Sequence, residues 1–176
     1  ESRWDTLVDL VVDAGPLIFL AKLDAFDVFA TAARRAVVPP SVLAETARPE
    51  LAFRHPEAAI IGRAAADGVI TVVALEGVER VFATGLSGRT AGLHAGELEV
   101  LALGSTRRWP VCLHERQASR LARGMGIETV DTIELLFDGT PDRERLRERI
   151  RSFAGLTNMV SADLDQLLSL IEEGKQ

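Results

Sequence analysis

Four carboxylates stand at positions where an α/β fold would bring them together. Asp13 ends an apolar run typical of a buried strand, and Glu115 follows a second such run, "PVCLH". Glu45 and Glu97 lie in apolar segments with helical spacing, and Glu97 shares a helix face with Leu101, where a core side chain is expected. Taken singly, each acid has an ordinary role at a helix N-terminus or on the surface. Taken together, they would raise one another's pKa unless a cation balances them.

The residue types favour a hard divalent cation as that balance, because Mg²⁺ and Mn²⁺ prefer oxygen ligands. The chain has three histidines, which form no cluster, and a single cysteine, Cys112, inside the apolar run "VCL". We therefore expect neither a zinc site nor an internal disulfide, and we interpret Cys112 as a buried small side chain. Ser41 and Ser87 have no histidine as a near neighbour, although distance in the sequence leaves a catalytic triad open.

Three arginines, Arg116, Arg120 and Arg123, follow Glu115 at helical spacing i, i+4, i+7. The opposite face of the same segment is apolar and consists of Ala118, Leu121, Ala122 and Met125. Such a row could bind a phosphodiester backbone, or it could be an ordinary solvated helix face. With two Trp, seven Phe and no Tyr, the chain offers little for a base-stacking surface, so any recognition of nucleic acid would depend on backbone charge and shape.

Strand-like runs alternate with helical segments along the chain. This order predicts a three-layer α/β/α domain with a mainly parallel central sheet. Strands are expected at 7–13, 36–38, 68–75, 110–113 and 127–130. Helices are expected at 15–33, 39–47, 95–104, 116–126 and 131–137. The glycine-rich residues 85–94 are predicted to form a loop at the edge of the crevice, and no glycine pattern of the chain matches a nucleotide-binding fingerprint.

The segment from residue 140 onward predicts two further helices. Thr140 is expected as the N-cap and Pro141 as the first helical residue, followed by the apolar stripe Leu146, Ile150 and Phe153 and the solvated face "DRERLRER". A second stripe comprises Leu164, Leu167, Leu168 and Ile171. We therefore divide the chain into a domain at 1–139 and a helical extension at 140–176, packed on the domain or on a partner.

Composition bounds the class of protein. With 176 residues and 47% hydrophobic content, the chain can bury one ordinary core, and its net charge of −6 argues against a broadly basic surface. No apolar run approaches the roughly 18 residues of a membrane span, and no basic-then-apolar leader opens the chain. The sequence is that expected of a soluble, cytoplasmic protein with no membrane association.

Four stretches resemble, in order, the blocks of PIN-domain proteins. They are "VVDAGPLIFLAKLD", "VVPPSVLAET", "AGELEVLALG" and "VCLHERQASRLARGMGIETVDTIELL", and the resemblance spans residues 8 to 137. The closest group is that of the VapC-like PIN ribonucleases. The resemblance implies an α/β/α, metal-dependent endoribonuclease that is often the toxin of a toxin–antitoxin pair and hydrolyses RNA by means of a metal-activated water.

The resemblance also assigns residues by position. It makes Asp13, Glu45, Glu97 and Glu115 the catalytic acids, with Asp13, Glu97 and Glu115 as ligands of Mg²⁺ or Mn²⁺ and Glu45 holding a water or a second ion. Arg116, Arg120 and Arg123 would contact RNA. The last block departs from the family pattern, because Glu115 replaces the usual Asp and His114 replaces another acid. We expect His114 to pack rather than to act in the site.

Two other classes of function have to be weighed, and only the first of them has support in the sequence. A PIN-like fold with a weakened site could act as a non-catalytic binding or regulatory module, and the residues at 114 and 115 favour that alternative. A phosphoryl-accepting receiver domain lacks support, because no acidic pair stands at the first strand end. As partners we expect an RNA substrate and an antitoxin-like protein, and the apolar stripe at 164–171 favours a homodimer.

Overall fold

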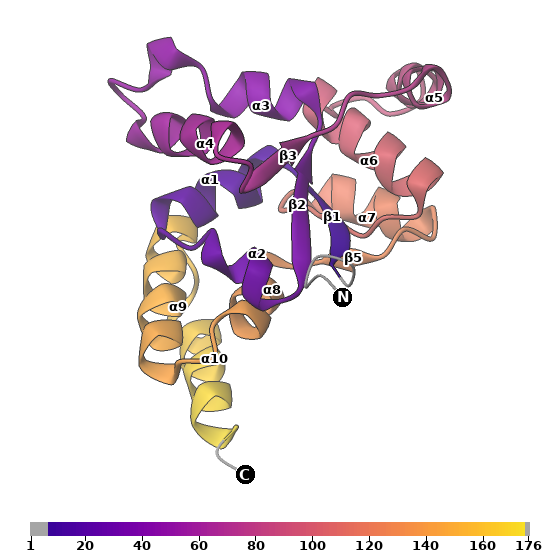
Figure 1. Cartoon of the computed structure of the whole chain (residues 1–176). Coiled ribbons are helices and arrows are strands. Elements are labelled where there is room, and N and C mark those ends of the chain that lie inside the picture. The colour runs from indigo at the N-terminus through magenta and orange to yellow at the C-terminus, as the bar shows by residue number, and fades with distance from the viewer. Residues whose placement is uncertain (1–6, 175–176) are drawn as a thin grey trace, which may run out of the picture.

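Five parallel strands form the central sheet in the order β3-β2-β1-β4-β5 (Figure 1). The computed structural model describes residues 7–174. The strands are Val8–Val12 (β1), Arg34–Val38 (β2), Ile70–Val72 (β3), Val111–Cys112 (β4) and Thr129–Val130 (β5). The predicted α/β class is confirmed, and the sheet is parallel throughout. The strand order changes direction between β1 and β4, which is where such sheets place their crevices.

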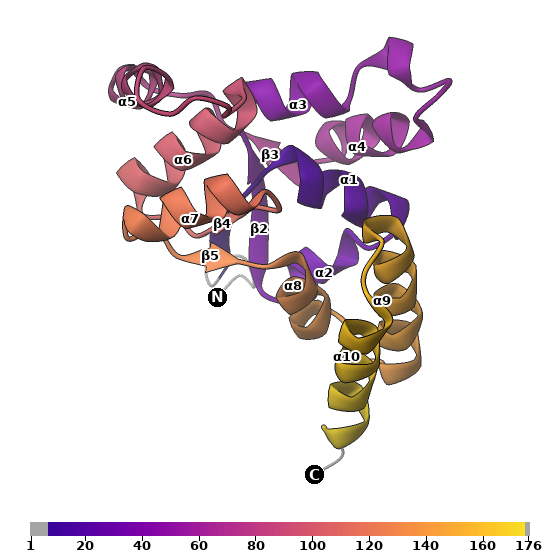
Figure 2. The ribbon, with the colours of Figure 1, turned by 180° about the vertical axis from the view of Figure 1, so that it is seen from behind.

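Helices cover both faces of the sheet (Figures 1 and 2). Helices α6 and α7 lie on one side, and α1, α2 and α4 lie on the other. The bounds of these helices are Ala14–Lys22 (α1), Asp27–Thr31 (α2), Pro56–Ala66 (α4), Ala95–Arg107 (α6) and Arg116–Gly124 (α7). The remaining helices are Pro40–Thr46 (α3), Gly77–Ser87 (α5), Thr132–Gly139 (α8), Arg143–Thr157 (α9) and Ser161–Glu173 (α10), with a 3₁₀ turn at Pro49–Leu51.

The apolar runs of the sequence form the strands because both faces of the sheet are covered. Leu10, Val11 and Val12 of β1 are fully buried, as are Val37 and Val38 of β2. A strand buried on both faces needs apolar residues at consecutive positions, which is the pattern seen here. Cys112 in β4 is also buried, as predicted.

The predicted helix at 15–33 is interrupted. Helix α1 ends at Lys22, and Asp24 has a left-handed backbone with φ of 48° before α2 begins at Asp27. Aspartate tolerates this conformation better than most residues, and its place within an otherwise helical pattern hid the break.

The predicted loop at 85–94 is too long at its beginning. Helix α5 runs through Gly85 to Ser87, and the connection to α6 occupies 88–94. Helix α5 starts with the Glu76–Glu79 capping box, and Phe82 and Leu86 pack against the core. This packing outweighs the roughly 1 kcal/mol that a glycine costs within a helix.

The start of α9 differs from the predicted one. Asp142, rather than Thr140, is the N-cap, because its side chain accepts a hydrogen bond from the Arg145 backbone N–H at 2.8 Å. Thr140 instead accepts a hydrogen bond from Arg149 at 2.7 Å. Aspartate is a stronger N-cap than threonine, and an available aspartate two residues later sets the start.

Helix α9 packs on the domain through the stripe Leu146, Ile150 and Phe153, which is buried as predicted. Arg149 was predicted on the solvated face but is only 5% exposed. Its guanidinium forms an ion pair with Asp27 of α2. Helix α10 packs on α9 and buries Ile171. Within residues 7–174, the helices lack the length and apolar content of a membrane span.

Candidate active site

Asp13 lies at the centre of the carboxyl edge of the sheet. It directly follows β1, and its backbone N–H donates to the Cys112 carbonyl of β4 at 3.0 Å. Its carbonyl accepts from the Leu17 N–H at 3.1 Å, so the residue is also the start of α1. Only 5% of Asp13 is exposed. The strand and the helix therefore hold this carboxylate in the crevice where the strand order changes direction.

Gly96 brings two further elements close to Asp13. A Cβ added at Gly96 would lie 3.1 Å from Val42 Cγ2, 3.5 Å from Glu45 Oε2 and 3.8 Å from Asp13 Oδ1. Helix α3 is held on α6 by Ser41, whose backbone N–H and hydroxyl donate to Glu99 at 3.0 and 2.8 Å. The glycine and this pair of hydrogen bonds place the carboxylates of Asp13 and Glu45 beside the same turn of α6.

Glu97 is the buried acid that interrupts the apolar pattern of α6. It is 6% exposed, and its Oε2 accepts a hydrogen bond from the His94 backbone N–H at 2.8 Å. This bond satisfies one of the free N–H groups at the start of the helix. Glu97 thus combines a local capping role with a negative charge next to Asp13.

Glu115 reaches the same edge from the end of β4, where it is the residue before α7 and is exposed. Burial and the neighbouring acids together raise the pKa of Asp13 to about 6. Burial is the largest cause, and the charges of Glu97, Glu45 and Glu115 raise the pKa further, while a hydrogen bond from the Ala14 backbone lowers it. The structure therefore places Glu45, Glu97 and Glu115 close enough to Asp13 for their charges to affect its pKa.

The donor set fits a hard divalent cation in chemistry. Within the described part of the chain, no Lys, Arg or His side chain forms an ion pair with any of the four acids. A buried carboxylate without a cation is unstable, and all four groups offer the oxygen ligands that Mg²⁺ and Mn²⁺ prefer. Among residues 7–174, however, no three acidic, histidine or cysteine side chains converge into a complete metal-binding group. The ligand assignment therefore stays a prediction.

His114 contacts α1, although it is exposed and also lines the pocket beside α7. Its ring meets that of Phe19 edge to face, with 4.8 Å between centroids, and Phe19 in turn contacts Phe153 of α9 at 5.4 Å. A Cβ added at Gly15 would lie 3.1 Å from the His114 Cβ, so the absence of a side chain at Gly15 permits the contact. The aromatic contacts fix the segment that carries Glu115.

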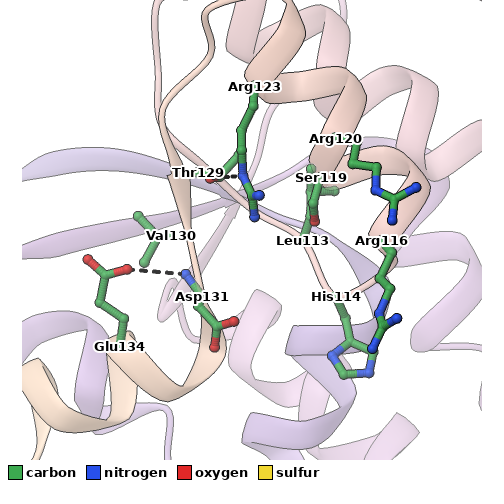
Figure 3. A pocket seen from close by; sticks show the side chains of 10 residues that line it. All are labelled: Leu113, His114, Arg116, Ser119, Arg120, Arg123, Thr129, Val130, Asp131 and Glu134. Carbon is green, nitrogen blue, oxygen red and sulfur yellow. Dashed lines mark hydrogen bonds between the residues drawn. The ribbon is translucent and has the colours of Figure 1, made fainter.

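The arginines of α7 line a pocket of about 560 Å³ beside this site (Figure 3). Arg116, Arg120 and Arg123 are exposed, and the Arg123 Nε donates to the Thr129 hydroxyl at 3.4 Å. The row predicted from the sequence is therefore exposed to solvent and also lines a pocket. A second pocket, of about 350 Å³, opens beside Glu45 and Gly96 on the other side of the acids.

One acid at the same edge was not identified from the sequence. Asp131 directly follows β5, caps α8 by accepting from the Ile133 N–H at 2.7 Å, and lines the arginine pocket. The sequence predicts it only as the first residue of the helix at 131–137. The signal was present, because "IETVD" ends an apolar strand with an acid just as "LVDLVVD" does.

Comparison with known proteins identifies the family of this chain. The family model DUF3368, described as a PIN domain, matches residues 9–152. No curated protein and no solved structure shows a significant match. The matched segment includes all four acids, strands β2 to β5 and β1 from its second residue onward. The chain belongs to the PIN-domain family, whose members are generally metal-dependent nucleases.

Proposed function

We propose that this protein is a metal-dependent endoribonuclease. The observation that carries the proposal is the buried carboxylate of Asp13, which has three carboxylates as electrostatic neighbours and no basic partner among the described residues. Such an arrangement is unfavourable for folding and is maintained where it serves a site. It supports an active PIN nuclease better than it supports an inert module.

Asp13, Glu97 and Glu115 would hold Mg²⁺ or Mn²⁺, and Glu45 would hold a water or a second ion. When bound, the cation lowers the pKa of a water and offsets charge on the phosphate oxygens. Backbone hydrogen bonds to two elements, β4 and α1, fix the position of Asp13. Glu45 is exposed and can adjust to the substrate.

No serine needs to act as the nucleophile. The hydroxyl of Ser41 donates to Glu99, and Ser41 therefore serves to join α3 to α6. This bond gives Ser41 a structural role and removes the support for a serine triad at this residue. Hydrolysis by water agrees with the all-carboxylate character of the site.

The substrate contacts come from α7. Arg116 and Arg120 form no ion pair in the described part of the chain, and both line the pocket beside α7 (Figure 3). Unpaired arginines next to clustered acids supply the positive charge that a phosphodiester backbone needs on approach. RNA would lie along α7 with its scissile phosphate near Asp13.

We further infer a toxin role with an antitoxin-like protein partner and a homodimeric state. The block pattern resembles VapC-like proteins, and apolar side chains remain exposed on the C-terminal helices and on the turn that joins them. Val160 is 65% exposed, Leu170 49% and Leu156 39%. Burial of these side chains by a partner would be favourable. Light scattering of the purified chain tests the dimer, and a monomer at all concentrations would contradict it.

A second candidate function is a non-catalytic PIN-like binding module. Glu97 is turned toward its own helix start, and among residues 7–174 no complete ligand group is formed. Both observations favour a binding module over an active nuclease. It predicts no cleavage of RNA under any metal condition.

The deciding experiment is incubation of a mixed RNA pool with Mg²⁺, with Mn²⁺ and with EDTA. We expect cleavage with either metal, none with EDTA, and a loss of at least about 100-fold for Asp13→Asn. Asp67→Asn, an exposed substitution at the end of α4, is the matched control and should cleave normally. If the RNA stays equally intact with the wild type and with Asp13→Asn under every metal condition, the non-catalytic binding module is favoured.

A further inference from the structure

The pocket beside α7 has two walls of opposite chemistry (Figure 3). One wall carries the guanidinium groups of Arg116, Arg120 and Arg123. The other, at the end of β5 and the start of α8, carries the carboxylates of Asp131 and Glu134. Hydroxyls of Ser119 and Thr129 also line it. Its volume of about 560 Å³ lies within the roughly 300–1,000 Å³ of small-molecule sites.

The two walls do not neutralise each other. In the described residues, none of the three arginines forms an ion pair with Asp131 or Glu134, although Figure 3 shows Arg123 extending toward Asp131. Elsewhere in the chain, arginines and acids that face each other do pair, as Arg107 does with Glu79 at 2.6 Å. The pocket therefore keeps separate positive and negative ends, and each end is available to a ligand.

A ligand that satisfies both walls must itself have two ends. The arginines need an anion, such as a phosphate. The carboxylates would repel a phosphate and need a neutral group with N–H donors. A continuous phosphodiester backbone could not cross the whole pocket, because it would meet Asp131 and Glu134. A single nucleotide, with its phosphate toward α7 and its base toward α8, fits both ends.

We propose that this pocket binds one nucleotide of the RNA and selects guanine. The Watson–Crick edge of guanine carries two adjacent donors, N1–H and N2–H, which can donate to the remaining carboxylate oxygens of Asp131 and Glu134. Adenine and cytosine each offer one donor beside an acceptor, and uracil offers one donor between two carbonyls. Only guanine therefore avoids an acceptor facing the carboxylate. The inference rests on the proposed function and adds the base preference of the same enzyme.

Capping contacts at the start of α8 orient the acceptor wall. Asp131 Oδ1 accepts from the Ile133 N–H at 2.7 Å, leaving its second oxygen available to a base. Glu134 Oε2 approaches the Asp131 backbone N–H at 3.5 Å. Both residues also start α8, so substitutions must preserve capping. Asparagine caps a helix as well as aspartate does, and glutamine can replace glutamate in a capping box.

The first measurement is calorimetric binding of GMP, AMP, CMP and UMP to the full chain in EDTA. We expect GMP to bind roughly 10-fold more tightly than the others, the discrimination of a good bidentate contact. Asp131→Asn or Glu134→Gln should remove that preference, and Arg123→Ala should weaken all four mononucleotides alike. Asp138→Asn on the exposed face of α8 and Arg63→Ala on α4 are matched controls and should change nothing.

Equal affinity for the four mononucleotides, or a preference for GMP that persists in both Asp131→Asn and Glu134→Gln, would overturn the proposal. A result in which none of the four mononucleotides binds would also overturn it. The second measurement maps the cut sites in a metal-containing RNA digest, where cleavage should occur next to guanine and lose this bias in the carboxylate variants. Cleavage without base preference would overturn the pocket but leave the nuclease intact. Selective GMP binding without any cleavage would support the pocket while the nuclease proposal fails.

Discussion

Two buried carboxylates of this protein have almost the same exposure and opposite surroundings. Glu79 on α5 is 4% exposed, and Asp13 is 5% exposed. Glu79 accepts hydrogen bonds from Arg107 at 2.6 and 3.1 Å, from the Glu76 N–H at 2.6 Å and from Thr106 at 3.1 Å. Asp13 instead has other acids as its charged neighbours. One buried charge holds two helices together, and the other is left for a ligand from outside.

The pKa values of the two groups differ in direction for these reasons. The hydrogen bonds from Arg107 are the main cause that lowers the pKa of Glu79 to about 2. Burial is the main cause that raises the pKa of Asp13 to about 6. Each shift corresponds to roughly 3 kcal/mol of differential interaction. Glu79 therefore stabilises the fold when ionised, whereas ionised Asp13 destabilises it.

The largest effect on stability is expected from removing the partner of Glu79. Arg107→Ala leaves a buried carboxylate with only a backbone and a hydroxyl donor, and should lower the free energy of unfolding by about 3 kcal/mol. Urea denaturation at pH 7 measures this. Arg63→Ala, an exposed arginine on α4, should have almost no effect. A loss no greater than that of the control would mean that the ion pair does not hold α5 on α6.

Asp13 should behave in the opposite way. In EDTA at pH 8, Asp13→Asn should raise the free energy of unfolding by about 2 kcal/mol, because it removes a buried charge while asparagine retains the same shape. The folded protein binds this proton more tightly than the unfolded chain, whose aspartate has a pKa near 3.8. The destabilisation by Asp13 therefore grows as the pH rises from about 4 to 6 and is constant above that.

Denaturation of both proteins at pH 8 and at pH 4 tests the sign of this effect. The advantage of Asp13→Asn should be largest at pH 8 and should nearly disappear at pH 4. A destabilised Asp13→Asn protein at pH 8, without metal, would contradict the idea that this carboxylate lacks a cationic partner.

The sequence predicts the site around Asp13 but not the ion pair of Glu79. Asp13 and Glu97 could be identified because each breaks or ends an apolar pattern, and a parallel sheet brings strand ends together. The pairing of Glu79 with Arg107 could not, because it depends on how α5 packs on α6. Both residues look like ordinary surface charges in their own segments.

The same limit explains the errors at Arg149 and Asp131. Arg149 lies on the charged side of an amphipathic helix, and only the docking of α9 beside α2 shows that Asp27 meets it there. Asp131 has the sequence pattern of a helix start, and only the tertiary structure shows its place beside the arginine pocket. Local patterns predicted the elements of this fold, whereas partners on different helices required the tertiary structure.

A bound metal ion should offset the destabilisation that the charge of Asp13 causes, whereas Glu79 already has Arg107 as its cation. An ion bound only by the folded protein stabilises it by about 1.4 kcal/mol when its concentration is ten times the Kd. Mg²⁺ or Mn²⁺ should therefore raise the Tm of the wild type, and Asp13→Asn should lose most of that rise. NaCl at matched ionic strength is the control for screening. A Tm that does not respond to either metal would leave the charge around Asp13 unexplained by a cation.

The smallest effect on stability is expected at Glu115. This acid is exposed, and it is the last of the three that raise the pKa of Asp13. Glu115→Gln should therefore change the free energy of unfolding by less than about 0.5 kcal/mol in EDTA. If Glu115 contacts the metal, the same variant should still reduce the metal-induced rise in Tm and the rate of RNA cleavage. Glu128→Gln, an exposed glutamate beyond α7, is the control and should leave both unchanged. If Glu115→Gln keeps the full metal-induced rise in Tm and the full rate of cleavage, Glu115 does not bind the metal. The metal site would then consist of Asp13, Glu97 and Glu45 alone.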